Sequence, residues 1–83
     1  MDDNLMSDIL ESLSEIKDDS SVPKNVKIKI DGIISVLKQN DLEISIRVDK
    51  AQQELDDICS DTNLQSFTRN QLWNVVSLLE MLL

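Results

Sequence analysis

The stretch from Ser66 to Leu83 is the most apolar in the chain and contains its single tryptophan. Placed on a helix at about 100° per residue, its Leu, Val and Trp side chains cover an arc of roughly 220°. A helix this apolar is normally buried by several neighbours. We therefore expect a helix over about 67–82, capped by Ser66, with the other helices arranged around it. Trp73 is most simply a core residue of this helix, and otherwise a binding anchor.

Three further segments carry apolar residues at helical spacing, and they span about 3–18, 23–39 and 41–59. In the third segment an apolar stripe is formed by Ile44, Val48, Ala51, Leu55 and Ile58. They are separated by four and three residues in turn, which is the spacing found in the seam of a narrow helical bundle. Short connections favour antiparallel packing of each helix against the next. We expect residues 1–83 to form one domain, an all-α, up-and-down antiparallel four-helix bundle.

Local signals predict where the helices begin. Pro23 fits the first turn of the second helix, where its missing amide hydrogen costs nothing. The run N-D-L-E has the spacing of a capping box, so we expect Asn40 to cap the third helix while Glu43 reaches back to it. Gly32 lies inside the second helix at a cost of about 1 kcal/mol relative to alanine. Either a neighbouring helix approaches closely at Gly32, or the helix tolerates it.

Charge is distributed unevenly along the chain, whose net charge is −8. Residues 1–21 and 41–61 hold seven acidic residues each, whereas residues 22–40 hold four lysines and one aspartate. The simplest interpretation is pairing between neighbouring helices, worth about 0–1 kcal/mol for each exposed pair. Because the net charge repels phosphate backbones, we do not expect nucleic acid as the main partner.

Targeting signals and membrane spans are not evident in the sequence. The first residues are acidic and amphipathic, whereas a signal peptide needs a basic start and an apolar stretch. No run approaches the roughly 20 apolar residues of a membrane span. The single cysteine excludes an internal disulfide and suits a reducing compartment. We therefore expect a cytoplasmic protein without membrane contact.

The residue types that usually carry catalysis are scarce. The chain has no His, no Tyr and one Cys, so common general bases and thiol pairs are missing. Asp56, Asp57 and Asp61 with Asn63 are conceivable oxygen ligands, but calcium loops need more ligands and a glycine at the sharp turn. Cys59 lies beside the apolar seam and is expected to be a buried structural thiol. We predict no catalytic, metal-binding or cofactor-binding residues.

More apolar side chains are present than one small bundle readily buries. Several lie off the apolar stripe of their helix, and the last helix is apolar over more than half of its circumference. Such surplus surface often marks an interface, although scattered exposed apolar residues are normal. The candidate interface comprises Ile28, Ile46, Val75, Leu78 and Leu82, and its partner would be another protein or a second copy in a homodimer. The candidate basic patch comprises Lys24, Lys27 and Lys29.

Two stretches, Val22-Pro23-Lys24-Asn25 and residues 61–80, DTNLQSFTRNQLWNVVSLLE, have a familiar pattern. They resemble uncharacterised protein family 0147, small archaeal helical proteins of unknown function. Members also carry an arginine–alanine element that matches Arg47 and Ala51, and a tail that reads D-P-N-x-P, then R-T-x-I-W-N-x-V-S-x-L-E. This chain departs from the tail at four positions: Thr62 and Gln65 replace prolines, Asn70 replaces threonine and Leu72 replaces isoleucine.

The resemblance implies a compact four-helix up-and-down bundle, and it implies no function because no activity is attached to the family. From the residues we expect a non-enzymatic cytoplasmic protein that acts through protein–protein interaction or self-association. Two alternatives stay open. One is an RNA- or ribosome-associated factor that uses the lysine cluster of the second helix, and the other is a carboxylate-based metal-binding or hydrolytic protein.

Overall fold

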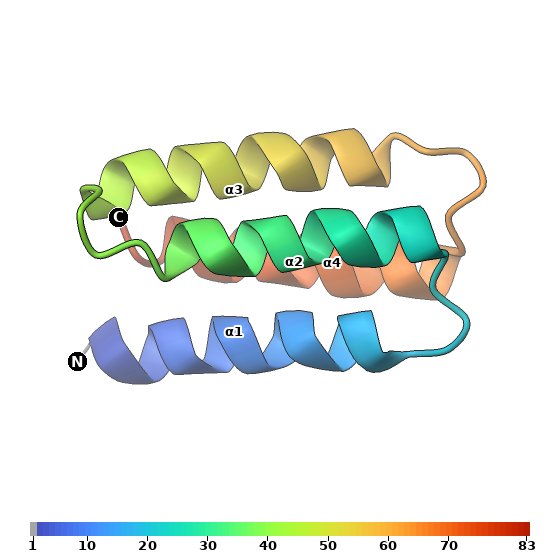
Figure 1. The fold of residues 1–83 in the computed structure, drawn as a ribbon, viewed down its shortest axis with the longest axis horizontal. Helices are drawn as coiled ribbons and strands as arrows, with labels where there is room; N and C mark the ends of the chain where they lie inside the picture. The colour runs from blue at the N-terminus through green and yellow to red at the C-terminus, as the bar shows by residue number, and fades with distance from the viewer. Residues whose placement is uncertain (1) are drawn as a thin grey trace.

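The computed structural model describes the backbone of residues 2–83 and the side chains of residues 4–83. Within this range it contains four helices, α1 (Asp2–Asp18), α2 (Lys24–Leu37), α3 (Ile44–Cys59) and α4 (Ser66–Glu80). Successive helices run in opposite directions and form an elongated bundle of 34 × 19 × 18 Å (Figure 1). The predicted all-α, up-and-down four-helix bundle is confirmed.

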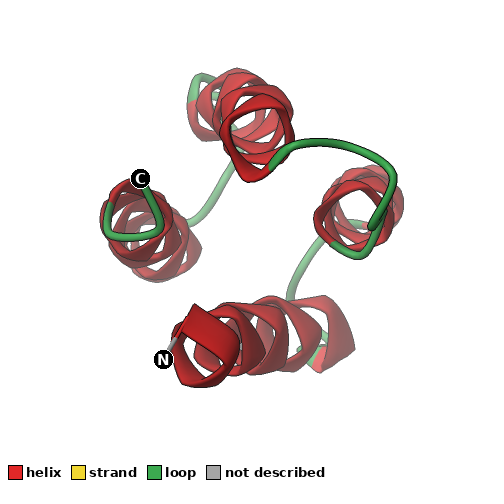
Figure 2. Cartoon of the chain, turned by 90° about the vertical axis from the view of Figure 1, so that its left-hand side faces the viewer, coloured by secondary structure: helices red, strands yellow, loops and turns green. Residues whose placement is uncertain are grey.

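The helices stand at the corners of a square when the bundle is viewed along its axis (Figure 2). Both α1 and α3 pack against α2 and α4, so each helix has two neighbours. Among the described residues, the diagonally opposed helices do not approach each other closely. The prediction that the other helices are arranged around α4 is therefore wrong. With two neighbours rather than several, α4 cannot bury the whole of its wide apolar arc.

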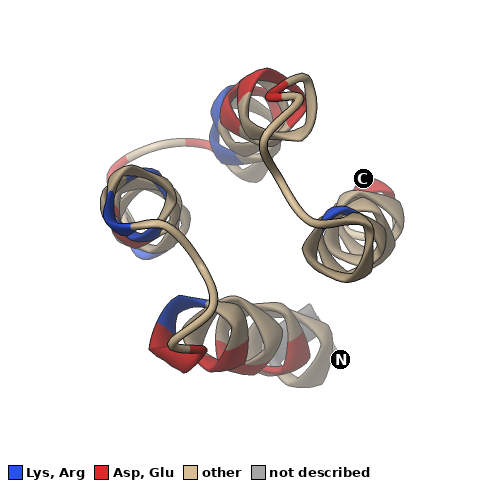
Figure 3. Cartoon of the chain, turned by 90° about the vertical axis from the view of Figure 1, so that its right-hand side faces the viewer, with Lys and Arg blue, Asp and Glu red and all other residues tan. Residues whose placement is uncertain are grey.

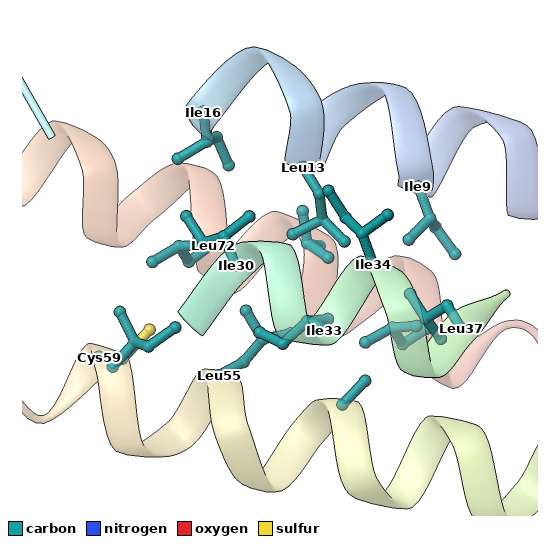
Figure 4. Close-up of a cluster of buried hydrophobic side chains, with 14 of the residues drawn as sticks. Ile9, Leu13, Ile16, Ile30, Ile33, Ile34, Leu37, Leu55, Cys59 and Leu72 are labelled. Atoms are coloured by element: carbon teal, nitrogen blue, oxygen red, sulfur yellow. The ribbon is translucent and has the colours of Figure 1, made fainter. Parts of the chain in front are cut away.

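A single hydrophobic core runs along the centre of the bundle, and all four helices contribute to it (Figure 4). Its most deeply buried large side chains include Ile9, Leu13, Ile30, Ile33, Leu37, Leu55, Ile58, Leu72 and Leu79. On each helix these residues lie three, four or seven positions apart, which places them on one face. The apolar seam predicted for α3 is buried from Val48 to Ile58, and Ile44 is half-buried at its start.

The same backbone turn precedes α2, α3 and α4. In each turn an amide donates to the carbonyl oxygen three residues earlier; these pairs are Val22 to Asp19, Leu42 to Gln39 and Leu64 to Asp61, at 3.1 to 3.2 Å. The following residue is extended, with ψ between 144° and 150°; it is Pro23, Glu43 or Gln65. This residue is the N-cap, and none of the three forms a side-chain capping bond.

These turns correct the predicted helix starts. Pro23 is the N-cap of α2 rather than part of its first turn. Asn40 and Glu43 form no capping box, because α3 begins only after Glu43. Ser66 is the first residue of α4, and Gln65 precedes it as the N-cap. The backbone closes each turn with its own hydrogen bond and passes through one extended residue, so α2 and α3 start later than the side-chain signals suggest, and α4 starts one residue earlier.

An arginine at the start of each of the last two helices holds the end of the helix before it. Arg69 in α4 donates from Nε to the carbonyl oxygen of Cys59, at 3.0 Å, and from Nη2 to that of Asp61, at 2.8 Å. Arg47 makes an equivalent pair of bonds at the end of α2. Helix ends leave their last carbonyl groups without helical partners. The two guanidinium groups therefore satisfy these carbonyls and hold the connections in place.

Ion pairs join neighbouring helices, as the charge distribution predicts. Lys17 of α1 lies 3.2 Å from Asp31 of α2, and Lys29 of α2 lies 2.7 Å from Asp57 of α3. Both pairs are largely exposed to solvent, so their contribution to stability is small. Figure 3 shows that charged residues gather on α1, α2 and α3, whereas α4 is nearly free of them.

Gly32 lies on the exposed side of α2, and a methyl group there would meet no atom within 4 Å. No helix approaches at this position, so the helix tolerates the glycine. Among the described helices, none combines the length with the apolar character that a membrane span requires.

Candidate interaction surface

The acidic segment at the end of α3 directs its carboxylates to different partners. Asp57 accepts a hydrogen bond from Lys29 at 2.7 Å, and Asp61 accepts one from the amide of Asn63 at 2.9 Å. Asp56 lines a groove that lies between α3 and α4. Over the described residues, no three or more His, Cys, Asp or Glu side chains lie where they could hold a metal ion.

Cys59 is buried at the end of α3, with 7% of its surface exposed. Burial raises the pKa of the Cys59 thiol above its ordinary value; the guanidinium of Arg69 opposes this, and the carboxylate of Asp56 adds to it. The nucleophile of cysteine chemistry is the thiolate, which a raised pKa disfavours. The prediction of a buried thiol is confirmed.

The five candidate interface residues do not share one surface. Ile28 on α2 and Ile46 on α3 are exposed by 64% and 43%, as predicted for side chains off the apolar stripes. Leu78 is partly buried against the core. Val75 and Leu82 are corrections: they are 0% and 7% exposed and belong to the core, because they face the neighbours of α4.

Other apolar side chains around α4 are exposed instead. Phe67 is 65% exposed, Trp73 43%, Met81 69% and Leu83 72%. The interpretation of Trp73 as a core residue is therefore wrong. Trp73 lies at the margin of an apolar arc that two neighbours cover only in part, so its ring reaches solvent.

A groove of about 520 Å³ lies between α3 and α4, and Trp73 is part of its wall. Its other lining residues are Asp49, Gln52, Gln53 and Asp56 from α3, Val76 and Glu80 from α4, and Leu83 beyond α4. On both helices these residues recur at helical spacing, so each set forms one face. The apolar members lie on the α4 side, and three carboxylates flank them. We call this feature the α3/α4 groove.

Comparison with known proteins places the chain in a family. The model of the uncharacterised protein family (UPF0147) matches residues 1–82. This chain belongs to the UPF0147 family. A UPF0147 protein from Metallosphaera sedula is 38% identical over 68 residues, which are 82% of this chain and 76% of the relative. The family resemblance inferred from residues 22–25 and 61–80 is thereby confirmed, and the family remains uncharacterised.

Two crystal structures share the fold of this UPF0147 chain. A UPF0147 protein from Thermoplasma acidophilum matches with a TM-score of 0.94 and 29% identity, covering 99% of this chain and 96% of that one. The protein of unknown function MMP1188 matches with a TM-score of 0.91 and 35% identity, covering 96% and 91%. One of these proteins is of unknown function and the other comes from an uncharacterised family, so the shared four-helix bundle does not define an activity.

The lysine cluster of the UPF0147 chain is divided between two sides of α2. Lys24 and Lys27 line a hollow of about 340 Å³ between α1 and α2, together with Lys17, Asp18, Ile28 and Asp31. Lys29 turns toward α3, where hydrogen bonding to Asp57 raises the pKa of its ammonium group. The three predicted lysines therefore do not form one basic patch.

A larger hollow, of about 620 Å³, lies at the end of the bundle where α2 stops and α3 begins. Its lining residues are Met6, Leu10, Leu37, Lys38, Asn40, Ile44, Arg47 and Leu82. The guanidinium of Arg47 is already hydrogen-bonded to the protein there, because it donates to the carbonyl oxygens of Leu42 at 3.0 Å and Leu37 at 3.1 Å. The geometry indicates a structural role for this arginine.

The width of the apolar arc on the last helix is the sequence signal for exposed apolar surface on α4, although from the sequence alone we interpret it as a sign of burial. An apolar arc of roughly 220° exceeds what two flanking helices cover in a bundle of this kind. The excess falls on Trp73, at one edge of the arc, and the aspartates of α3 lie across the groove from it. No feature of the α3 sequence alone indicates that Asp49 and Asp56 line a groove with a tryptophan.

Proposed function

We propose that this UPF0147 chain is a non-enzymatic protein–protein interaction module of the cytoplasm. The observation that carries the proposal is the group of exposed apolar side chains around α4, namely Phe67, Trp73, Met81 and Leu83. Exposed aromatic and methionine side chains are enriched at protein interfaces. Trp73 is the most suitable anchor because tryptophan dominates the binding energy of many interfaces.

The proposal is tested by affinity purification of the tagged protein from its native cell extract, followed by mass spectrometry. Trp73→Ala is compared with Ile28→Ala, which also removes an exposed apolar side chain but lies on α2, the helix diagonal to α4. We expect a reproducible partner set with the wild type and with Ile28→Ala, and its loss with Trp73→Ala. Recovery of no other protein, together with a monomer by light scattering, would refute the proposal.

Half of each extract is treated with nuclease before purification. A partner set that survives nuclease supports direct protein contact. Loss of the set with nuclease would replace the proposal by the RNA- or ribosome-associated alternative, in which Lys24 and Lys27 make the contacts. A homodimer detected by light scattering would make self-association the form that the interaction takes. Cell fractionation tests the cytoplasmic location.

A further inference from the structure

We propose that the α3/α4 groove binds a basic amphipathic helix of a partner protein, an inference that rests on the proposed interaction function. The occupant would place apolar side chains on the α4 side of the groove and lysine or arginine side chains beside its carboxylates. Amphipathic helices bind grooves in this way through anchors that recur every three or four residues.

The apolar side of the groove supplies the anchor contacts. Trp73 is 43% exposed and Leu83 is 72% exposed, while Val76 between them is half-buried. Trp73 and Val76 lie one turn apart on the same face of α4, and both line the groove. A partner helix would remove these side chains from water without any rearrangement of the core.

The charge around the groove specifies a basic occupant. Asp49 and Asp56 on α3 and Glu80 on α4 line it, and among the described residues no lysine or arginine does. Asp49 accepts a bond from Gln53 at 3.0 Å. The ion pairs between described side chains, Lys17 with Asp31 and Lys29 with Asp57, lie elsewhere. The three carboxylates are thus available to a cation from outside, and Trp73 adds a ring face that attracts ammonium and guanidinium groups.

A second copy of this chain fits the groove less well than a basic partner. In a symmetric dimer with the two grooves facing each other, the three carboxylates of one groove would lie against the same three carboxylates of the other. Each molecule also carries a net charge of −8. Like charges across an interface disfavour it. The hollow between α1 and α2 is more basic, but docking it into the groove of the next molecule would be a head-to-tail contact, which builds a ring or a filament and not a two-fold dimer.

The length of the groove sets the length of the probe. Within α4, Trp73 and Glu80 lie about 10 Å apart along the helix axis, at 1.5 Å per residue, and Leu83 lies beyond the end of the helix. About 14 residues of helix cover this distance with two turns to spare. The probe is a labelled synthetic peptide of that length made only of leucine and lysine, with leucine on one face. The control peptide has the same composition, but its leucine and lysine residues are reordered so that it has no apolar face.

Binding is measured by fluorescence anisotropy of the labelled peptide, and Trp73 emission is the local reporter because the protein has one tryptophan and the peptides have none. We expect saturable binding of the amphipathic peptide with a blue shift of Trp73 emission, and weaker binding of the reordered peptide. The triple variant Asp49→Asn, Asp56→Asn, Glu80→Gln should weaken binding about tenfold, from the loss of three partly exposed ion pairs. Trp73→Ala should weaken it similarly.

The matched control is the triple variant Asp8→Asn, Glu11→Gln, Glu15→Gln, which removes the same net charge from the exposed side of α1. It should leave the affinity within about twofold, since screened charges act weakly beyond roughly 10 Å in ordinary buffer. Equal weakening by the two triple variants would overturn the proposal, because binding would then follow net charge. Equal binding of the two peptides, or an unchanged Trp73 spectrum at saturation, would also overturn it.

The groove variant also separates this inference from the proposed function. If native-extract purification recovers a partner set that survives in the Asp49→Asn, Asp56→Asn, Glu80→Gln variant, the groove assignment fails and the interaction function stands. If light scattering shows a dimer that this variant or Trp73→Ala dissociates, the occupant is a second copy and the basic-partner assignment fails. Circular dichroism confirms that each variant stays helical.

Discussion

Replacing Arg69 by methionine removes the guanidinium that holds the α3–α4 connection while retaining an unbranched side chain of similar length. Two hydrogen bonds are lost, to Cys59 O at 3.0 Å and Asp61 O at 2.8 Å. A charged donor makes such hydrogen bonds stronger, but Arg69 is only partly buried. In the variant, water would bind each carbonyl oxygen in part, so we expect a loss of about 1 kcal/mol per bond. A positive charge at the C-terminal end of α3 adds about 0.3–1 kcal/mol.

The expected decrease in unfolding free energy is therefore about 2–3 kcal/mol. For a chain of this length the whole unfolding free energy is roughly 4–12 kcal/mol. The corresponding fall in Tm is on the order of 10–20 °C. Arg69→Lys retains the charge but not the two-pronged geometry, so it should lower the unfolding free energy by about half as much as Arg69→Met.

Urea unfolding followed by circular dichroism and by Trp73 fluorescence measures both variants. Lys50→Met is the control, because it removes a cation from the exposed face of α3 and should change stability by less than about 0.5 kcal/mol. A loss below about 0.5 kcal/mol for Arg69→Met, or full retention of stability by Arg69→Lys, would show that the two carbonyl bonds do not hold the connection.

Three further predictions concern stability and reactivity. Gly32→Ala should raise the unfolding free energy by about 0.5–1 kcal/mol in urea titrations, since a methyl group there meets nothing within 4 Å; destabilisation would contradict the open position. Leu72→Ala should lower it by about 2–5 kcal/mol by opening a cavity at a side chain that is 0% exposed, and a loss under 1 kcal/mol would mean that the core collapses around the gap. The pKa of Cys59 is raised on folding, so its stabilising contribution is complete below the ordinary value of 9.0 and is lost as the pH rises through the folded value. Stability should accordingly fall more steeply above pH 9.0 in the wild type than in Cys59→Ala, and parallel curves would refute this.

The sequence was sufficient to predict the existence and order of the helices. Apolar residues at intervals of three and four, as in the seam from Val48 to Ile58, leave few alternatives for a chain with one glycine and one proline. Helix starts were predicted less well. Asn40 and Ser66 are good capping residues in isolation, but a backbone turn shared by the three connections places the N-cap elsewhere.

Exposure on α4 could not be predicted, for a different reason. The width of an apolar arc counts apolar residues, whereas burial depends on how many helices surround the arc. Ile28 and Ile46 were correctly expected at the surface because they lie off the stripes of their own helices. Trp73 and Val75 lie within one arc, and only the square arrangement decides that the first reaches solvent while the second is enclosed.

The ring of contacts also bears on how the chain folds. Three of the interfaces join consecutive helices across short connections, and the fourth, between α1 and α4, joins helices from opposite ends of the described chain. Local contacts form quickly, whereas closing a long loop carries a larger entropic cost. During synthesis, α1 can therefore pack against α2 while its other flank stays open, until α4 leaves the ribosome and completes the ring.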